Sequence, residues 1–222
     1  MKLELTFVLY FYKNTSKKVK NGGDNMVDTQ KLLELAKLNN GIITTAMVVD
    51  AGISRGILKY LADRGELEKV SRGVYTLPGA WEDEFVNIQS RFKRGIFSLE
   101  TALFLCDLTD RTPVRYQMVF PETYNLSGPK QEGIVCRGSK EPLYSLGVTD
   151  LKTPGGNTVR GYCAERSLCD ILRHRNHTDI QIVSDAFKKY TSRKEKNVPL
   201  LSEYAHKLRV EERVRTYLEV LL

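Results

Sequence analysis

Basic side chains gather in one short stretch of the chain, where they could bind phosphate. Between Ser54 and Gly73 the sequence places five of them: Arg55, Lys59, Arg64, Lys69 and Arg72. Lysine and arginine neutralise the phosphates of a nucleic-acid backbone, and arginine also recognises guanine in the major groove. Three acidic residues in the same stretch dilute the charge, so the role depends on which side chains share a face. We predict that these five, together with Thr45 and Ser54, contact DNA.

Two short helices are predicted to hold the first part of this stretch. Thr44 or Thr45 can cap the first helix by accepting a hydrogen bond from a free amide at its start. After a glycine turn, Ser54 can cap a second helix that runs to about residue 64. The apolar residues of this second helix form one stripe: Ile57, Leu58 and Leu61. The basic residues of the helix therefore lie on the opposite, polar face.

A β-hairpin is predicted to carry the rest of the stretch. Runs of β type over 67–70 and 74–77 flank Ser71-Arg72-Gly73, which places an arginine at the hairpin tip. With an apolar helix over 28–38 in front, the segment 26–80 has the layout of a winged helix-turn-helix. Such modules commonly dock a helix in the major groove with the wing beside the backbone. Winged helices also dock proteins, so a protein-docking module is the alternative at this point.

Composition and charge describe the chain only broadly. Its 222 residues are 41% hydrophobic and 27% charged, as in a soluble globular protein. The formal net charge of +7 divides into +3 for residues 1–25 (five basic, two acidic), +1 for 26–80 (seven, six) and +3 for 81–222 (22, 19). The DNA hypothesis therefore rests on the placement of charge and not on its total.

Residues 1–25 are predicted to be a leader outside the fold. Their apolar run, 5–12, is too short to span a membrane, and no small-residue cleavage site of a signal peptide follows it. The codons of Gly22-Gly23 can spell a purine-rich ribosome-binding site, so we expect translation to start at Met26. We expect a cytoplasmic protein with no membrane segment and with its four cysteines reduced.

Residues 81–222 are expected to form a second domain of the α+β class, because strands come first and helices last. A connecting helix over 81–92 and a helix over 99–108, capped by Ser98, precede the strands. The predicted strands are 116–120, 134–137, 143–146 and 159–162, and the predicted final helices are 165–173, 180–190, 200–208 and 211–221.

Residues that could do catalytic chemistry are sparse. The sequence contains no glycine-rich phosphate loop, nucleophile elbow or zinc-protease helix. Asp150-Leu151-Lys152 matches the acid-x-Lys end of a metal-dependent nuclease motif, a pattern that also arises often by chance. Cys169 with His174 and His177 lacks the fourth ligand and the spacing of a zinc site. We therefore predict no catalytic residue, no cofactor and no metal, and keep as an alternative a DNA-targeted nuclease that uses Asp150 and Lys152.

Two charged features of the second domain could be structural or functional. Arg166 and Asp170 are one helical turn apart, and a structural ion pair, weak if exposed, is the favoured interpretation. The segment 188–196 is rich in positive charge. Solvated surface is the ordinary interpretation of that segment, and DNA contact by its residues Lys188, Lys189 and Arg193 is the functional one.

A series of short motifs follows in order along the chain. In the first half they are Gly41-Ile42-Ile43-Thr44-Thr45, Ala51-Gly52-Ile53-Ser54-Arg55, Gly65-Glu66-Leu67 and Arg72-Gly73-Val74-Tyr75. In the second half they are Gly95-Ile96-Phe97-Ser98, Thr101-Ala102-Leu103, Leu108-Thr109-Asp110, Pro121-Glu122-Thr123-Tyr124-Asn125, Ala164-Glu165-Arg166-Ser167-Leu168-Cys169-Asp170 and Tyr217-Leu218-Glu219-Val220-Leu221. In this order and spacing the chain resembles the AbiEi family of antitoxins from type IV abortive-infection toxin–antitoxin systems.

The resemblance implies a winged helix that binds operator DNA with inverted repeats and represses its own operon. It also implies a C-terminal domain that counters a nucleotidyltransferase toxin encoded next door, without forming a stable complex with that toxin. Cooperative self-association on DNA is compatible with this picture. A plain transcriptional regulator with a ligand-sensing second domain remains an alternative.

Overall fold

The computed structural model describes residues 24–173, 176 and 178–222. They form two compact units. The first comprises the described residues up to Arg91 together with Gly155–Asn157, and the second comprises Phe92–Pro154 and Thr158–Leu222. The predicted leader lies outside the described residues except for its last two, which belong to the first helix. The predicted domain limits, 26–80 and 81–222, stay a prediction.

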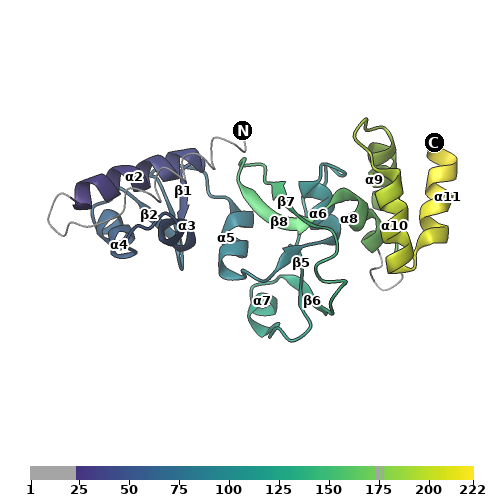
Figure 1. Cartoon of the computed structure of the whole chain (residues 1–222), viewed down its shortest axis with the longest axis horizontal. Helices are drawn as coiled ribbons and strands as arrows, with labels where there is room; N and C mark the ends of the chain where they lie inside the picture. The colour runs from purple at the N-terminus through teal and green to yellow at the C-terminus, as the bar shows by residue number, and fades with distance from the viewer. Residues whose placement is uncertain (1–23, 174–175, 177) are drawn as a thin grey trace. The chain divides into compact units, whose positions relative to one another are not determined.

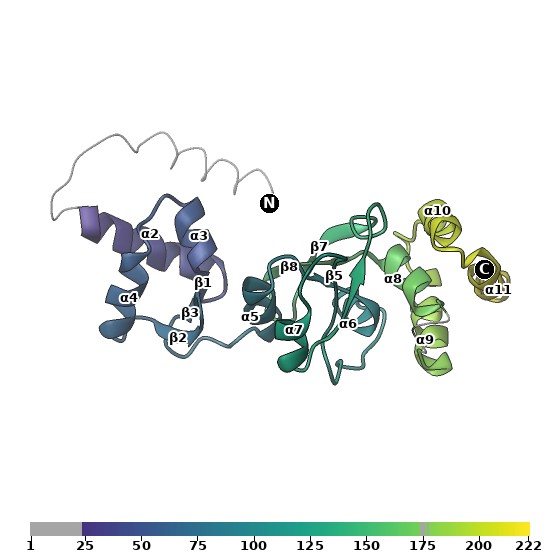
Figure 2. The same cartoon turned by 90° about the horizontal axis from the view of Figure 1, so that it is seen from below.

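The first unit is a winged helix-turn-helix, as predicted. Its elements are α2 (Asp24–Leu38), β1 (Ile42–Thr44), α3 (Thr45–Asp50), α4 (Gly56–Asp63), β2 (Glu68–Ser71), β3 (Val74–Thr76) and α5 (Glu84–Arg91). The three strands form an antiparallel sheet in the order β1-β3-β2. Helices α2, α3 and α4 lie together beside this sheet (Figure 1), and a second view shows the same grouping (Figure 2).

The third strand, β1, is absent from the sequence prediction, which gave only a two-stranded hairpin. Its three residues are all buried and pair with β3. A run of three is too short to show the alternation by which a strand is recognised. Thr44, at the end of β1, caps α3 by accepting the amide of Met47 at 3.2 Å. Of the two threonines considered, Thr44 is therefore the cap.

One apolar cluster holds the first unit together. It is formed by buried residues of α2, β1, α3, α4 and the turns on either side of α4: Leu32, Ala36, Ile43, Val48, Ile53, Ile57, Leu58, Leu61 and Leu67. The predicted stripe of α4 belongs entirely to this cluster. Gly52 (φ 74°) makes the turn between α3 and α4, and Gly65 (φ 74°) follows α4. Both glycines adopt a left-handed backbone that other residues enter only at a cost.

The second unit is α+β, as predicted, and contains a mixed five-stranded sheet. Its strands are β4 (Ile96–Phe97), β5 (Gln117–Pro121), β6 (Val135–Ser139), β7 (Val148–Lys152) and β8 (Thr158–Tyr162), in the order β6-β5-β4-β8-β7. Its helices are α6 (Leu99–Leu105), α7 (Ser127–Gln131), α8 (Ala164–Ile171), α9 (Ile180–Thr191), α10 (Val198–Leu208) and α11 (Glu211–Leu221). The last three lie side by side in both views (Figure 1, Figure 2).

Residues 143–146, predicted as a strand, form turns instead, and the strand β7 begins only at Val148. The carbonyls of Leu143 and Leu146 accept hydrogen bonds from Nη1 of Arg166, at 2.9 and 3.0 Å. The amides of Tyr144 and Leu146 bond back to the carbonyls of Lys140 and Pro142, at 2.9 and 3.1 Å, and so close turns in place of a strand ladder. The predicted strand is therefore wrong, because the backbone of these residues forms turns that bond to Arg166.

The start and end of α6 also differ from the prediction. Ser98 occupies the cap position but makes no side-chain cap bond, and Oε1 of Gln117 accepts the amide of Glu100 instead, at 2.8 Å. The helix ends at Leu105, three residues early, and Asp107 adopts a left-handed backbone (φ 57°). In a further difference, the short helix α7 lies between β5 and β6, where the sequence analysis predicted no helix.

The Arg166–Asp170 ion pair is structural, as predicted, but it is fully buried. Nε of Arg166 lies 2.9 Å from Oδ2 of Asp170, and the two residues are 1% and 0% exposed. The other carboxylate oxygen has Arg137 at 3.7 Å and Arg173 at 3.5 Å but no hydrogen bond. The Arg166 guanidinium also lies over the Tyr162 ring, 4.4 Å from its centroid. The low energy of a surface pair therefore does not apply here.

We expect Arg166→Met to lower the free energy of unfolding of the second unit by about 3–5 kcal/mol. The substitution leaves the Asp170 carboxylate buried without its bonded partner. Chemical denaturation of the full chain, followed by circular dichroism, measures the change.

Lys207→Met is the matched control, because it removes another i,i+4 pair of the same unit. Lys207 and Glu203 lie 2.5 Å apart, but their side chains are 46% and 52% exposed. We expect its loss to cost no more than about 0.5 kcal/mol. Equal losses in the two variants would contradict a structural role for the buried pair.

Candidate nucleic-acid interface

The polar face of α4 carries the first group of predicted DNA contacts. Ser54, Arg55 and Lys59 are all exposed. The helix begins at Gly56, one residue later than predicted. Arg55, and not Ser54, occupies the cap position, and its side chain makes no cap bond. Oγ of Ser54 accepts the amide of Gly56 at 3.4 Å. The start of α4 therefore presents a hydroxyl and an arginine to solvent.

The wing carries Arg72 at its tip, between β2 and β3, where the side chain is exposed. Two contacts anchor the wing. Thr45 donates its amide to the carbonyl of Gly73 at 2.8 Å and its hydroxyl to the same oxygen at 3.3 Å. On the other side of the tip, at the end of β2, the hydroxyl of Ser71 donates to Oδ1 of Asn87 on α5, at 2.5 Å. The arginine therefore sits on an anchored loop, and Thr45 serves to position it.

Arg64, at the end of α4, is exposed but engaged with neighbouring side chains. Its Nε donates to Glu66 at 2.8 Å and its Nη1 to the hydroxyl of Tyr60 at 2.9 Å. The bond to Glu66 is the main cause that raises the pKa of the guanidinium. By contrast, Arg55, Lys59 and Arg72 form no ion pair with any described residue. These three cations have the greater freedom to meet a phosphate.

Lys69 completes the predicted contacts in the first unit. It is exposed on β2, opposite Tyr75 of β3. The predicted cationic contacts of this unit therefore lie on α4 and on the wing, two elements that one duplex could contact together in the usual docking of such modules.

The predicted contacts of the second unit are mostly engaged within that unit. Lys189 pairs with Asp110 at 2.6 Å. Arg193 donates to the carbonyls of Cys106 and Asp107 at 2.7 and 2.6 Å, which supports the end of α6. Of these three residues, only Lys188 is exposed; the other two are half-buried. DNA contact by these three residues stays a prediction. Two of them, Lys189 and Arg193, also make contacts that support the second unit itself.

The winged-helix segment matches a known family. Residues 30–78 match the family model described as "Transcriptional regulator, AbiEi antitoxin". These residues form an AbiEi antitoxin transcriptional-regulator domain. A comparison with curated proteins gave no match. Among solved structures, the chain is similar to the crystal structure of the RV2827C protein from Mycobacterium tuberculosis, with 13% identity, a TM-score of 0.49, and coverage of 86% of this chain and 73% of that one.

The AbiEi-type domain exposes two positions on α4 that the sequence prediction did not include. Gly56 and Tyr60 stand one turn apart on the polar face, and Tyr60 is 51% exposed. Their spacing from Arg64 was a usable signal, because residues four apart share a helix face. The prediction considered only charged and hydroxyl side chains there.

The acid-x-Lys pair, which belongs to the second unit, lies on β7 at the edge of the sheet. Asp150 is exposed opposite Arg160 of β8, and Nζ of Lys152 donates to the hydroxyl of Thr158 at 2.9 Å. Over residues 24–173, 176 and 178–222, no group of three or more His, Cys, Asp or Glu residues could hold a metal ion. The two histidines of the zinc site considered above, His174 and His177, lie outside the described residues. The geometry of Asp150 and Lys152 is that of ordinary cross-strand contacts.

The cysteine thiols have raised pKa values, chiefly because of burial. The pKa of Cys163 rises to about 11 and that of Cys106 to about 12. A thiol with such a pKa stays protonated near neutral pH, so it is a poor nucleophile.

Within the part of the chain that the structure describes, no helix is both long and apolar enough to cross a bilayer.

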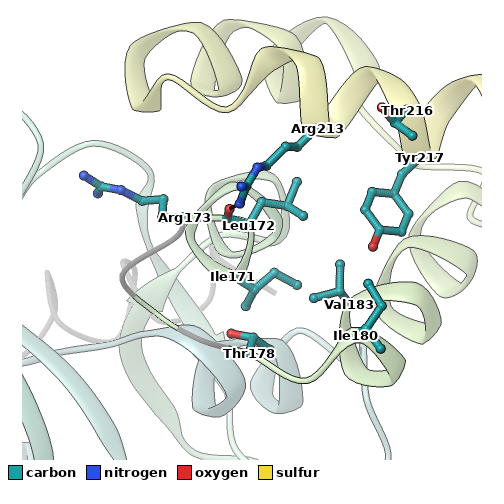
Figure 3. A pocket seen from close by; sticks show the side chains of 9 residues that line it. All are labelled: Ile171, Leu172, Arg173, Thr178, Ile180, Val183, Arg213, Thr216 and Tyr217. Carbon is teal, nitrogen blue, oxygen red and sulfur yellow. Dashed lines mark hydrogen bonds between the residues drawn. The ribbon is translucent and has the colours of Figure 1, made fainter.

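An open hollow of about 400 Å³ lies among α8, α9 and α11 of the second unit. Figure 3 shows Leu172, Val183 and Tyr217 facing it, whereas Arg173 points away from the other labelled side chains. Nη1 of Arg213 donates to the carbonyl of Leu172 at 2.5 Å. The lining therefore combines apolar side chains with two arginines and two threonines.

We expect Arg55→Ala and Arg72→Ala each to reduce the salt dependence of DNA binding. Each lost phosphate contact lowers the slope of log affinity against log salt by about one. Binding of the full chain to a fragment of its own promoter, titrated at several salt concentrations, measures the slope. Lys37→Ala is the control, because Lys37 is exposed on α2, outside α4 and the wing. If slope and affinity are unchanged in both arginine variants, the hypothesis that the winged helix binds DNA through these residues is wrong.

Proposed function

We propose that this protein is an antitoxin of a type IV toxin–antitoxin system and the DNA-binding autorepressor of its own operon. One observation carries the proposal: the segment that matches the AbiEi antitoxin regulator model, residues 30–78, also presents unpaired cations on α4 and the wing. A transcriptional regulator of this kind acts on DNA, and the exposed side chains supply the charge for it.

In the proposed complex, α4 enters the major groove and the wing lies on the backbone. Arg55 and Lys59 project from the polar face of α4, and Arg72 projects from the wing tip. Thr45 and the Ser71–Asn87 bond hold the wing in place before DNA arrives. Less conformational freedom is then lost on binding, which favours affinity. Inverted repeats in the operator would receive two copies of the chain, one on each half-site.

The second unit is proposed to counter a nucleotidyltransferase toxin without forming a stable complex with it. This part of the proposal rests on the resemblance of the C-terminal motifs to the AbiEi family. The protein is proposed to act in the cytoplasm and not as an enzyme, since regulators of this family typically lack catalysis.

A ligand-sensing regulator is the second candidate function. The open hollow among α8, α9 and α11 is the observation behind it, because its volume of about 400 Å³ falls in the range of small-molecule sites. The nuclease alternative has less support, since Asp150 and Lys152 lie on an edge strand in ordinary cross-strand contacts.

We expect the double variant Arg55→Ala/Arg72→Ala to lose repression and keep protection. Both residues are exposed, so their loss leaves the two cores intact. The toxin is encoded on an unrelated inducible promoter, and survival is scored beside a reporter driven by the operon's own promoter. Under the antitoxin model, survival matches that with the natural chain while the reporter rises.

The rival models give other outcomes in the same cells. A plain regulator protects only by lowering transcription, so it gives no protection once the toxin has an unrelated promoter. A nuclease cleaves promoter DNA in magnesium and stops when EDTA is added. Failure of the unaltered chain to protect, at normal abundance, would overturn the antitoxin part while leaving repression open to the reporter assay.

A further inference from the structure

Tyr60 places an aromatic ring on the polar face of α4, where the rest of the exposed surface is charged or small. Its side chain is 51% exposed, although the apolar stripe of the helix faces the opposite way. An exposed ring is not needed for the core, which is complete with Ile57, Leu58 and Leu61. The ring is therefore available to a partner of the helix.

Arg64 holds this ring in one place. Its Nη1 donates to the tyrosine hydroxyl at 2.9 Å, and its guanidinium lies 5.4 Å from the ring centroid. Glu66 holds the guanidinium in turn, at 2.8 Å. A side chain held by two such contacts loses less rotamer freedom on binding than a free one. Arg64 is thus a positioning residue for Tyr60.

Gly56 leaves room for close approach one turn before Tyr60. A Cβ added at this glycine would meet only the Ser54 hydroxyl, at 3.7 Å, so the space in front of it is open. The missing side chain makes a step in the helix surface beside the ring. A group from outside can fill that step and lie against the ring face.

We infer that Tyr60 is a base-reading residue whose ring packs against the methyl group of a thymine in the operator. The inference rests on the proposed binding of α4 in the major groove. Thymine methyl is the apolar group that base pairs display in that groove, and apolar side chains recognise it by contact. The hydroxyl of Tyr60 already accepts a bond from Arg64, so the ring is the surface that the residue offers.

The test replaces each thymine of the operator in turn by uracil, which lacks only this methyl group. The full-length chain should lose about 4-fold in affinity at one thymine of each half-site, the worth of one buried methyl group. Tyr60→Ala should bind the thymine operator more weakly, and the same uracil should then cost nothing further. Tyr60→Phe keeps the ring and the guanidinium beside it, although it loses the hydroxyl bond, and should keep most of the uracil effect. Melting temperatures of the variants confirm that each is folded.

Two further variants distinguish the thymine contact of Tyr60 from the charge of its neighbour Lys59 and from the positioning role of Arg64. Lys59→Ala removes an adjacent exposed cation, so it should lower the salt slope and retain the uracil effect. Arg64→Ala releases the ring, so it should reduce the uracil effect while Tyr60 is still present. A purely structural role for Arg64 would leave that effect unchanged in a folded variant.

The failures are distinguishable. If the unaltered chain binds its promoter and Arg55→Ala weakens that binding, but no uracil changes the affinity, the thymine contact is wrong and the proposed function stands. A uracil effect that persists fully in Tyr60→Ala assigns the methyl contact to another residue and overturns the inference. Absence of any promoter binding overturns both.

Discussion

The buried ion pair between Arg166 and Asp170 is the interaction on which the second unit depends. Arg166 satisfies three acceptors at once, the Asp170 carboxylate and the carbonyls of Leu143 and Leu146, and it covers the ring of Tyr162. One guanidinium thereby joins α8 to the turn before β7 and to the end of β8. A buried charge is tolerated only when it is paired and hydrogen-bonded. The backbone of residues 143–146 is shaped to meet that requirement, at the expense of a strand.

In the first unit, hydrogen bonds between neutral groups stabilise the wing. A two-stranded wing alone is marginal in water, and this one gains a third strand, β1, and two anchoring contacts beside its tip. Thr44 caps α3, while the next residue, Thr45, holds Gly73 at the wing tip. Also beside the tip, the Ser71–Asn87 bond ties the end of β2 to α5. The short motif Thr44-Thr45 therefore links the helix-turn-helix to the wing.

The use of positive charge divides the molecule's cations into two classes. Arg166, Arg193 and Arg213 donate to backbone carbonyls inside the second unit, where they close helix ends and turns. Arg55 and Arg72 stay exposed on the AbiEi-type domain. A segment with a net charge of only +1 can therefore still expose cations, because no acidic residue that the structure describes forms an ion pair with Arg55 or Arg72. The count of charges hides this, because it does not distinguish supporting arginines from displayed ones.

The sequence by itself determined the winged helix, because its signals are local: the apolar stripe of α4, the glycine turn before it, and the hairpin around Arg72. Helices α9, α10 and α11 were predicted for the same reason, since the 3.6-residue periodicity needs no distant partner. Tertiary structure decided what depends on residues far apart in the chain. It made 143–146 a turn, ended α6 early and added β1, each through contacts across many residues. It also placed Arg64 in a hydrogen bond with Tyr60, and Arg193 in hydrogen bonds with the carbonyls at the end of α6. A side chain's role is set by what lies within a few ångströms of it, and the sequence does not state that distance.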